Sequence, residues 1–403
     1  MLVLIADKLP AKGLADLRER GLTVDARPDL GADDLPAAVA ECGAGILVVR
    51  STKVTAAVFE KASNLGLVIR AGAGVNTIDL DAASRNGVYV ANCPGRNAIA
   101  VAELTMGLLL SMDRRIPDAV ADLRAGRWRK KLYGKADGLL GRRLGLIGFG
   151  SIAQAVAERA LAFGMHVGAY SRSLTEATAA AHGVKAYGSL DELLSECDAV
   201  SLHVPYGEGT KHLIGAPQLA KMKDGAMLVH TARGGVVDDA ALREAVEAGR
   251  IRAGLDVFED EPASGDAPFD APLRDVPGVY GTPHIGASTE QAQLATAAEV
   301  VRIVEGYMDH GGVANVVNVV PQRDAGWSIV VRHRDRVGVL ANVLGALREE
   351  NTNVQEMQNV IFRGNEAASA TIVVQREPTE ALLGKLREHD DILSVQVRAI
   401  GLS

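Results

Sequence analysis

The sequence LGLIGFGSIAQAVAERALAFGMHVGAYSRS, from Leu144 to Ser173, places a glycine turn between an apolar run and a segment with helical spacing. Its centre, residues 148–153, has the pattern G-x-G-x-x-A. The first glycine permits a sharp bend, the second lets a pyrophosphate approach the backbone, and a small third residue lets the helix pack on the strand. The helix start adds free amides and a positive dipole end. We therefore predict a dinucleotide-binding unit whose phosphate contacts come from Gly148, Gly150, Ser151 and Ile152.

The end of the same stretch concerns the ribose of the dinucleotide. A carboxylate usually stands at this strand end and accepts hydrogen bonds from the ribose hydroxyls. Here Tyr170 is followed by Ser171 and Arg172, whose hydroxyl and guanidinium can bind a 2′-phosphate. A solvated arginine beside a site that accepts an unphosphorylated ribose is the other interpretation. The predicted cofactor is therefore NAD or NADP, with Ser171 and Arg172 near the ribose.

Composition and charge exclude several classes of protein. The chain has 403 residues, of which 48% are hydrophobic and 23% charged, as in a globular protein of several domains. Its net charge of −7 offers no basic surface for nucleic acid. No apolar run approaches the roughly 20 residues of a membrane span. We therefore expect neither nucleic acid nor membrane as a partner. The opening MLVLIADKLP lacks the basic start of a signal peptide and is predicted as a strand.

The three cysteines, Cys42, Cys93 and Cys197, lie far apart and match no metal-binding spacing. We predict buried thiols rather than disulfides, as in a cytoplasmic protein. No metal is expected.

Short apolar runs alternate with amphipathic segments from the first residue to about residue 320. Strands buried on both faces and separated by helices are typical of doubly wound parallel sheets. Ten such runs are too many for one comfortable sheet, so we predict two α/β domains. The runs are LVLIA, GILVVR, LGLVIRAG, GVYVANCP, RLGLIGFG, HVGAYS, DAVSLHVP, GAMLVHTA, IRAGLDVF and GVYGTPH.

Two long helical stretches, Asn97 to Gly126 and Ser288 to His310, indicate where the two domains meet. They would carry the chain into and out of a nucleotide-binding domain over residues 97–287. Residues 1–96 and 288–320 would then form a substrate-binding domain. Further along, the order strand, helix, strand, strand, helix, strand predicts a separate α+β module over residues 326–403.

Three polar residues follow apolar runs downstream of the glycine turn: Arg233 in TARGG, Glu261 in FEDEP and His284 in TPHIG. Ligands of an open parallel sheet bind beyond the carboxyl ends of its strands, so these side chains are predicted to meet in one crevice. An arginine can bind a carboxylate bidentately, and a histidine can exchange a proton with a hydroxyl. A glutamate bonded to the imidazole fixes its tautomer. The set suits hydride exchange between a nicotinamide and a 2-hydroxy or 2-keto acid.

These motifs resemble the D-isomer-specific 2-hydroxyacid dehydrogenase family over essentially the whole chain. The resemblance rests on VRSTKVT, RAGAGVNTIDLDAA, NCPGRNAIAVAEL, GRWRKK, LGLIGFGSIAQAVA, TARGGVVDDAAL, LDVFEDEP and TPHIGAST. It implies a Rossmann-like nucleotide domain inserted in a flavodoxin-like substrate domain, and Arg233, Glu261 and His284 as the catalytic trio. It further implies substrate contacts from Arg50, Ser51, Ala73, Gly74 and Val75, and cofactor contacts from His203, Val204, Pro205, Thr231, Ala232 and Asp256.

Within the family, the chain most resembles the phosphoglycerate dehydrogenases, which implies oxidation of D-3-phosphoglycerate at the start of serine biosynthesis. The cations Arg127, Arg129, Lys130 and Lys131 resemble the basic stretch of that branch. They imply a phosphate site that includes Arg129 and Lys130, and a solvated basic surface is the alternative. Ser171 and Arg172 resemble instead the family's hydroxypyruvate and glyoxylate reductases, so an NADPH-dependent 2-keto acid reductase is the second hypothesis. A nucleotide-sensing corepressor that reuses the fold is the third.

The C-terminal module resembles an ACT domain, a small amino-acid-sensing unit, with Gly338 at its tight turn. In members that bind serine, a histidine and two asparagines contact the ligand. His333 and Asn353 match two of these positions, and Asp335 stands at the third. The resemblance implies L-serine or another amino acid as an effector, and pairing of sheets between copies is the alternative use. A homodimer or homotetramer fits the family.

Overall fold

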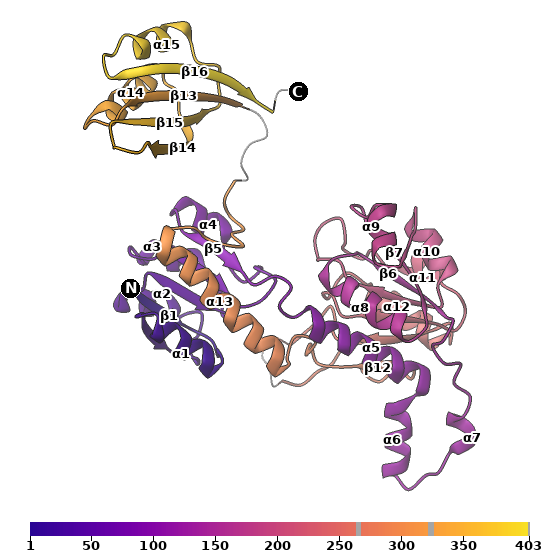
Figure 1. The fold of residues 1–403 in the computed structure, drawn as a ribbon. Coiled ribbons are helices and arrows are strands. Elements are labelled where there is room, and N and C mark those ends of the chain that lie inside the picture. The colour runs from indigo at the N-terminus through magenta and orange to yellow at the C-terminus, as the bar shows by residue number, and fades with distance from the viewer. Residues whose placement is uncertain (263–266, 321–325, 402–403) are drawn as a thin grey trace. The chain divides into compact units, whose positions relative to one another are not determined.

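The computed structural model describes residues 1–262, 267–320 and 326–401. The chain divides into two compact units, Met1–Asn318 and Val319–Ser403 (Figure 1). The first unit contains two parallel sheets, as the alternation of apolar runs and helices predicts. The second contains one antiparallel sheet. The predicted fold class, two α/β sheets followed by an α+β module, is therefore confirmed, and the predicted domain bounds remain predictions.

The first sheet has five parallel strands in the order β2-β1-β3-β4-β5, which is the flavodoxin-like order. Apolar side chains of α2, α3 and α4 pack on one face, and those of α1 and α13 pack on the other. The elements are β1 (Leu2–Ile5), α1 (Ala11–Glu19), β2 (Thr23–Ala26), α2 (Leu35–Cys42), β3 (Ile46–Val49), α3 (Ala56–Lys61), β4 (Leu67–Arg70), α4 (Leu80–Arg85), β5 (Tyr89–Asn92) and α13 (Glu290–His310).

The second sheet has seven parallel strands in the order β12-β11-β10-β9-β6-β7-β8, the doubly wound order of dinucleotide-binding domains. Helices α5, α8 and α9 cover one face, and α10, α11 and α12 cover the other. The elements are α5 (Ala98–Arg114), β6 (Arg143–Ile147), α8 (Ser151–Ala162), β7 (His166–Tyr170), α9 (Glu176–Ala181), β8 (Lys185–Ala186), α10 (Leu190–Glu196), β9 (Ala199–Leu202), α11 (Ala216–Lys221), β10 (Ala226–His230), α12 (Asp239–Glu247), β11 (Ile251–Leu255) and β12 (Val279–Gly281).

Two strands of these sheets are absent from the pattern of apolar runs. The strand β2 has the sequence TVDA, in which two residues are polar, and β8 has only two residues. Both lie at the edge of their sheet. A strand with one neighbour needs no continuous apolar run, so hydropathy alone does not reveal it.

The predicted helical stretch from Asn97 to Gly126 is wrong in its middle. The helix α5 ends at Arg114, and α6 (Ile116–Arg124) begins after Arg115, whose φ of 52° is left-handed. Pro117 in the first turn of α6 suits a helix start, because it lacks the N–H that a first turn leaves unpaired. A short helix, α7 (Lys130–Tyr133), follows. The second predicted stretch forms the single helix α13.

All three cysteines are free thiols, and two of them are buried as predicted. Cys42 is the exception, since it is only half-buried. It is the last residue of α2 and packs against the core of the first sheet.

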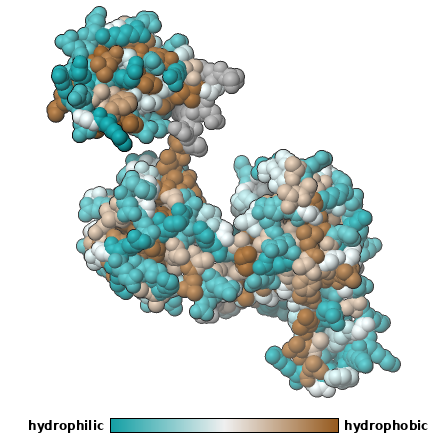
Figure 2. Space-filling model, viewed as in Figure 1, coloured by the Kyte–Doolittle hydropathy of each residue, from teal (hydrophilic) through white to brown (hydrophobic). Residues whose placement is uncertain are grey.

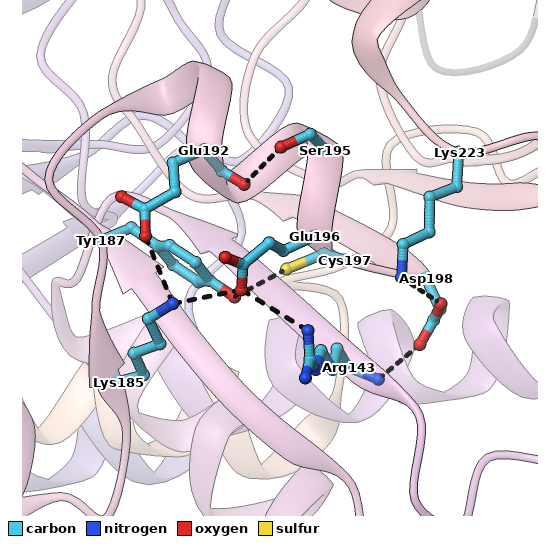
Figure 3. A network of polar contacts seen from close by, with 9 residues as sticks. All are labelled: Arg143, Lys185, Tyr187, Glu192, Ser195, Glu196, Cys197, Asp198 and Lys223. Atoms are coloured by element: carbon cyan, nitrogen blue, oxygen red, sulfur yellow. Dashed lines mark hydrogen bonds and ion pairs between the residues drawn. The ribbon is translucent and has the colours of Figure 1, made fainter.

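Polar contacts close the amino end of the second sheet, opposite the edge that carries the glycine turn (Figure 3). The carboxylate of Asp198, just before β9, accepts the N–H of Arg143 and the ammonium of Lys223, both at 2.8 Å. Burial opposes ionisation of Asp198, but these two donors hold its pKa below the usual range. Lys185 reaches Glu196 at 3.1 Å. These contacts join the start of β6 to the residue before β9, and the start of β8 to the end of α10, and they leave the carboxyl ends of the strands for the site.

The second unit has the predicted order of elements. Its antiparallel strands lie in the order β14-β15-β13-β16, and the two helices share one apolar core with them. The elements are β13 (Gly326–Arg334), α14 (Val339–Glu349), β14 (Val354–Ile361), β15 (Ala367–Val374), α15 (Glu380–Arg387) and β16 (Ile392–Ile400). Among the helices that the structure describes in both units, none is long and apolar enough to cross a membrane.

Candidate active site

A cavity of about 770 Å³ lies in the first unit, where the carboxyl ends of both sheets contribute to one wall. Loops after β1, β3 and β4 of the first sheet line it, as do loops after β10, β11 and β12 of the second. The described lining includes eight residues that the sequence predicts at the site: Arg50, Ser51, Ala73, Thr231, Arg233, Asp256, Glu261 and His284. Residues from sequence positions more than 200 apart therefore share one cavity.

His284 and Glu261 form a hydrogen-bonded pair in this cavity. The Nδ1 atom of His284 lies 2.7 Å from Oε2 of Glu261. The other carboxylate oxygen of Glu261 accepts the N–H of Phe258 at 3.1 Å. Burial opposes ionisation of Glu261, but the bond to His284 and the charge of Arg233 hold its pKa below the usual range. An ionised Glu261 accepts the Nδ1 proton, which leaves Nε2 of His284 for exchange with a substrate.

The turn that carries His284 is held by the buried carboxylate of Asp256. Its oxygens accept the hydroxyl of Thr282 at 2.6 Å and the N–H groups of Ile285 and Gly286, both at 2.8 Å. His284 has a φ of 52°, a left-handed conformation that is costly for a residue with a side chain. Three hydrogen bonds accepted by this one carboxylate stabilise that conformation. The cofactor contact predicted for Asp256 stays a prediction, since this carboxylate already has partners within the chain.

Arg233 lies beside the first sheet as well as the second. Its Nη1 donates to the carbonyl of Ala232 at 2.6 Å, and a Cβ placed on Gly74 would lie 3.7 Å from its Nη2. The loop that the resemblance assigns to the substrate therefore stands next to the arginine that it assigns to catalysis. Gly74 and Val75 lie just beyond the described cavity wall.

A half-buried arginine that sequence analysis did not single out also lines the cavity. Arg70 ends β4, and its Nε has no hydrogen-bond partner among the described residues. Burial lowers the pKa of Arg70, and the positive charges of Arg233 and Arg50 lower it further. The signal in the sequence is a charged residue at the end of an otherwise apolar strand, LVIR. Lys8 and Arg274 line the cavity too and were likewise not predicted.

The glycine turn has the geometry of a phosphate-binding turn. Gly148 has a φ of 89°, and a Cβ there would lie 2.4 Å from the carbonyl oxygen of His203. A Cβ on Gly150 would meet no atom within 4 Å, so the space beside the start of α8 is open. These residues fit a dinucleotide, with Ser151 and Ile152 in the first turn of α8. Val204 and Pro205 follow His203, and Ala232 follows Thr231 beside the cavity.

Three of the residues predicted to contact the cofactor, His203, Ser171 and Arg172, differ in their surroundings. Burial lowers the pKa of His203 to about 3, with its Nε2 2.9 Å from the hydroxyl of Ser201, so it stays neutral at ordinary pH. This agrees with a place at the cofactor rim rather than in proton transfer. At the end of β7, Ser171 is half-buried and Arg172 is exposed. Arg172 has no hydrogen bond or ion pair with any residue that the structure describes.

The basic stretch predicted to bind phosphate lies outside the described cavity wall. Arg127 pairs with Asp122 through bonds of 2.8 and 2.6 Å, and Arg129 lies 3.4 Å from the same carboxylate. Lys130 and Lys131 begin α7 and are exposed. The phosphate contact predicted for Arg129 and Lys130 therefore stays a prediction.

The residues predicted to bind an effector are only partly available. His333 is buried, its Nδ1 donates to the carbonyl of Arg334 at 2.8 Å, and its Nε2 lies 3.2 Å from Oδ1 of Asn359. Asp335 is half-buried, and Asn353 is exposed just before β14. Since both nitrogens of His333 have partners, the effector site with L-serine or another amino acid stays a prediction.

Asp239 lies beneath the loop of Glu261 and provides a test of stability. Its carboxylate accepts the N–H of Glu259 at 3.0 Å, and burial raises its pKa to about 6. Because the unfolded chain ionises this group near pH 4, the folded state loses stability as the pH rises from about 4 to about 6. Asp239→Asn is therefore expected to raise the free energy of unfolding at pH 8 by about 1–3 kcal/mol, and by much less near pH 4.

Urea unfolding at the two pH values measures this difference. Asp33→Asn removes an exposed carboxylate and serves as the control. Equal effects of Asp239→Asn at both pH values would contradict the assignment.

The comparisons with known proteins agree with this geometry. The family model described as "D-isomer specific 2-hydroxyacid dehydrogenase, NAD binding domain" matches residues 106–286. A D-3-phosphoglycerate dehydrogenase of Methanocaldococcus jannaschii is 39% identical over 388 residues, which cover 95% of this chain and 71% of that protein. This chain belongs to the D-isomer-specific 2-hydroxyacid dehydrogenases. The family that its motifs resemble is thereby confirmed.

Two further relatives bear on the branch of the family. A hydroxypyruvate reductase of Thermotoga maritima is 48% identical over 258 residues, which cover 64% of this chain and 82% of that protein. The crystal structure of the TT0316 protein of Thermus thermophilus superposes with a TM-score of 0.70 at 37% identity, over 79% of this chain and all of that one. The family member described here is an oxidoreductase with a nicotinamide-nucleotide domain, and its substrate is a small 2-hydroxy acid.

Proposed function

We propose that this dehydrogenase oxidises D-3-phosphoglycerate to 3-phosphohydroxypyruvate. The observation that carries the proposal is the charge of the cavity next to the His284–Glu261 pair. Among the described residues that line it are five cations and two carboxylates. One of those carboxylates holds the turn of His284 and the other holds its imidazole. A substrate with both a carboxylate and a phosphate balances these cations better than a monoanion does.

Each of three side chains in the cavity has a separate role in the reaction. Arg233 binds the substrate carboxylate and keeps the hydroxyl-bearing carbon in the cavity. Nε2 of His284 takes the hydroxyl proton, while Glu261 holds the imidazole by Nδ1 and stabilises the imidazolium. The nicotinamide nucleotide supplies the hydride acceptor when it is bound. In the direction of reduction, the same imidazole returns the proton.

A phosphate has a place near Arg70 and Arg50. The Nε atom of Arg70 is buried, and the neighbouring charges of Arg50 and Arg233 repel the guanidinium. An anion placed among these arginines relieves that repulsion and offers an acceptor to the unpartnered Nε of Arg70. We propose this location for the phosphate beside the contacts that the resemblance implies for Arg129 and Lys130.

Initial rates with D-3-phosphoglycerate, measured with NAD⁺ and NADP⁺ in parallel, test the proposed substrate. Turnover at ordinary enzyme rates, about 1–10³ per second, is expected with at least one nucleotide. Absence of turnover with both nucleotides would refute the proposal. The same assay excludes a corepressor without enzymatic activity if any 2-hydroxy acid is turned over.

The second candidate is an NADPH-dependent reductase of hydroxypyruvate or glyoxylate. Two observations favour it: the similarity to the Thermotoga reductase, and the exposed Arg172 at the end of β7. Rapid oxidation of NADPH by hydroxypyruvate or glyoxylate, without turnover of D-3-phosphoglycerate, would make it the function.

Arg172 is expected to select the nucleotide. A guanidinium bonded to a 2′-phosphate contributes about 1.5–3 kcal/mol, so Arg172→Asp is expected to raise the KM for NADP⁺ by about 10- to 100-fold. The new carboxylate can accept ribose hydroxyls, so the KM for NAD⁺ should fall. Steady-state kinetics with both nucleotides give the ratio of the KM for NADP⁺ to the KM for NAD⁺. Arg85→Asp makes the same charge change at the end of α4 and is the control. An unchanged ratio would make Arg172 a bystander.

We further propose a homo-oligomer that forms through the segment of α6 and α7. Apolar side chains gather along α6 (Figure 2) and continue beyond it. Trp128 is 80% exposed, and the other exposed apolar residues of this segment are Ile116, Val120, Leu123 and Leu132. Such a patch is typical of an interface. In an oligomer, the cations at 129–131 of one copy could contact the substrate cavity of a neighbouring copy. Sedimentation as a monomer at micromolar concentration would contradict the proposal.

A further inference from the structure

The loop that carries Arg50 is tied to a carboxylate of the neighbouring strand. Asp7 follows β1, and its Oδ2 accepts the N–H groups of Arg50 at 2.7 Å, Ser51 at 3.1 Å and Thr52 at 3.1 Å. Three successive amides that converge on one anion form a nest, a backbone arrangement suited to negative charge. Here the anion in the nest belongs to the protein itself.

This arrangement changes the role expected of the loop. The family resemblance assigns Arg50 and Ser51 of this loop to the substrate. The amides of Arg50 and Ser51 already have Asp7 as their acceptor. Only the side chains of this loop are then left for the substrate, and both residues line the cavity. Asp7 itself is half-buried behind the loop and is absent from the described cavity wall.

We propose that Asp7 is a positioning residue that holds the loop of residues 50–52 so that the Arg50 side chain projects into the substrate cavity. The other end of the loop is already secured, because Val54 pairs with Ile78 through a β-bridge. The start of the loop is secured by the Asp7 carboxylate, which accepts its three amides. Charge-assisted hydrogen bonds are about twice as strong as neutral ones, and three of them resist rotation of the loop away from the cavity. Asp7 also supplies one negative charge behind the cluster of Arg50, Arg70 and Arg233.

Asp7→Ala and Asp7→Asn test the proposal on the full chain. Loss of the carboxylate is expected to raise the KM for the 2-hydroxy acid by about 10- to 100-fold in Asp7→Ala, and less in Asp7→Asn, whose amide oxygen still accepts hydrogen bonds. The KM for the nucleotide should stay unchanged, because the glycine turn belongs to the other sheet. Asp25→Ala is the control, since Asp25 lies on β2 of the same sheet and bonds only to Arg27 in the described contacts.

Rescue of the KM by sodium formate separates a positioning role of Asp7 from a purely structural one. In Asp7→Ala, a formate ion fits beside the three vacated amides. It should lower the KM toward the wild-type value, relative to sodium chloride at equal ionic strength, and should have no such effect in Asp25→Ala. An unchanged KM in Asp7→Ala, or equal effects of formate in both variants, would overturn the proposal. If Asp7→Ala does not fold, a KM for the acid in Asp7→Asn equal to that of the wild type overturns it.

The inference rests on the proposed function only for the choice of substrate. The KM is measured with D-3-phosphoglycerate or, if the wild type does not turn it over, with hydroxypyruvate and NADPH. Failure of the proposed substrate therefore shows in the wild type, whereas failure of the role of Asp7 shows in the comparison between variants.

Discussion

Replacement of His284 by asparagine is expected to lower kcat by about 10²- to 10⁴-fold, the range that a positioned general base contributes. Asparagine keeps a polar group of similar reach but cannot accept the hydroxyl proton. The KM for the nucleotide should change little, because the glycine turn and α8 are untouched. Steady-state rates with saturating nucleotide measure the effect.

His212→Asn is the matched control for this variant. His212 bonds to Glu259 on the same loop that carries Glu261, but it is absent from the described cavity wall. Its replacement should leave kcat within a few-fold of wild type. A kcat of His284→Asn within tenfold of wild type would remove His284 from the proton transfer.

Arg233→Lys is expected to lower kcat/KM by about 10²- to 10³-fold. Lysine keeps the charge but loses the planar fork that binds a carboxylate through two parallel hydrogen bonds. Loss of these bonds to a charged group, at about 1.5–3 kcal/mol each, accounts for the size of the effect. The loss should appear with every 2-hydroxy acid that the enzyme accepts, because the carboxylate is common to all of them.

Arg274→Lys provides the comparison within the same cavity. Arg274 lines the cavity, yet its guanidinium pairs with Asp275 at 2.7 Å and with Asp270 at 3.3 Å. A lysine there should therefore cost little. Equal losses in the two variants would indicate a general need for positive charge rather than a specific contact by Arg233.

Much of the architecture follows from local patterns in the chain. A strand buried on both faces needs a continuous apolar run, and all ten runs found in the first 320 residues form strands. The glycine turn is local in its pattern and in the φ of 89° at Gly148, whereas the close carbonyl of His203, which leaves no room for a side chain, is a contact of the folded chain. The edge strands β2 and β8 lack such a run. The corner at Arg115 also escapes prediction, because both sides of it have helical spacing.

Arg233, Glu261 and His284 could be found because each follows an apolar run, and parallel strands bring such positions to one edge. Arg70 was missed because a single charge at a strand end has the same pattern as a solvated residue. The phosphate site predicted for the basic stretch at 127–131 rests on its charge and on its resemblance to the phosphoglycerate dehydrogenases. In the folded chain Asp122 already neutralises part of it. The sequence gives the number of charged residues, but it does not reveal which of them are already paired in the folded chain.

The order of apolar runs, turns and polar strand ends thus specified two parallel sheets, a C-terminal α+β module and the residue types of a 2-hydroxyacid dehydrogenase. These features depend on short-range patterns, because burial, chain reversal and helix formation are set within a few residues. Three features came from the folded chain alone: the 2.7 Å bond between Glu261 and His284, the position of Arg70 near Arg50 and Arg233, and the bonds that the amides of the Arg50 loop donate to Asp7. They join residues 20 to 163 positions apart, and distances of that kind are fixed by how sheets and loops pack in three dimensions.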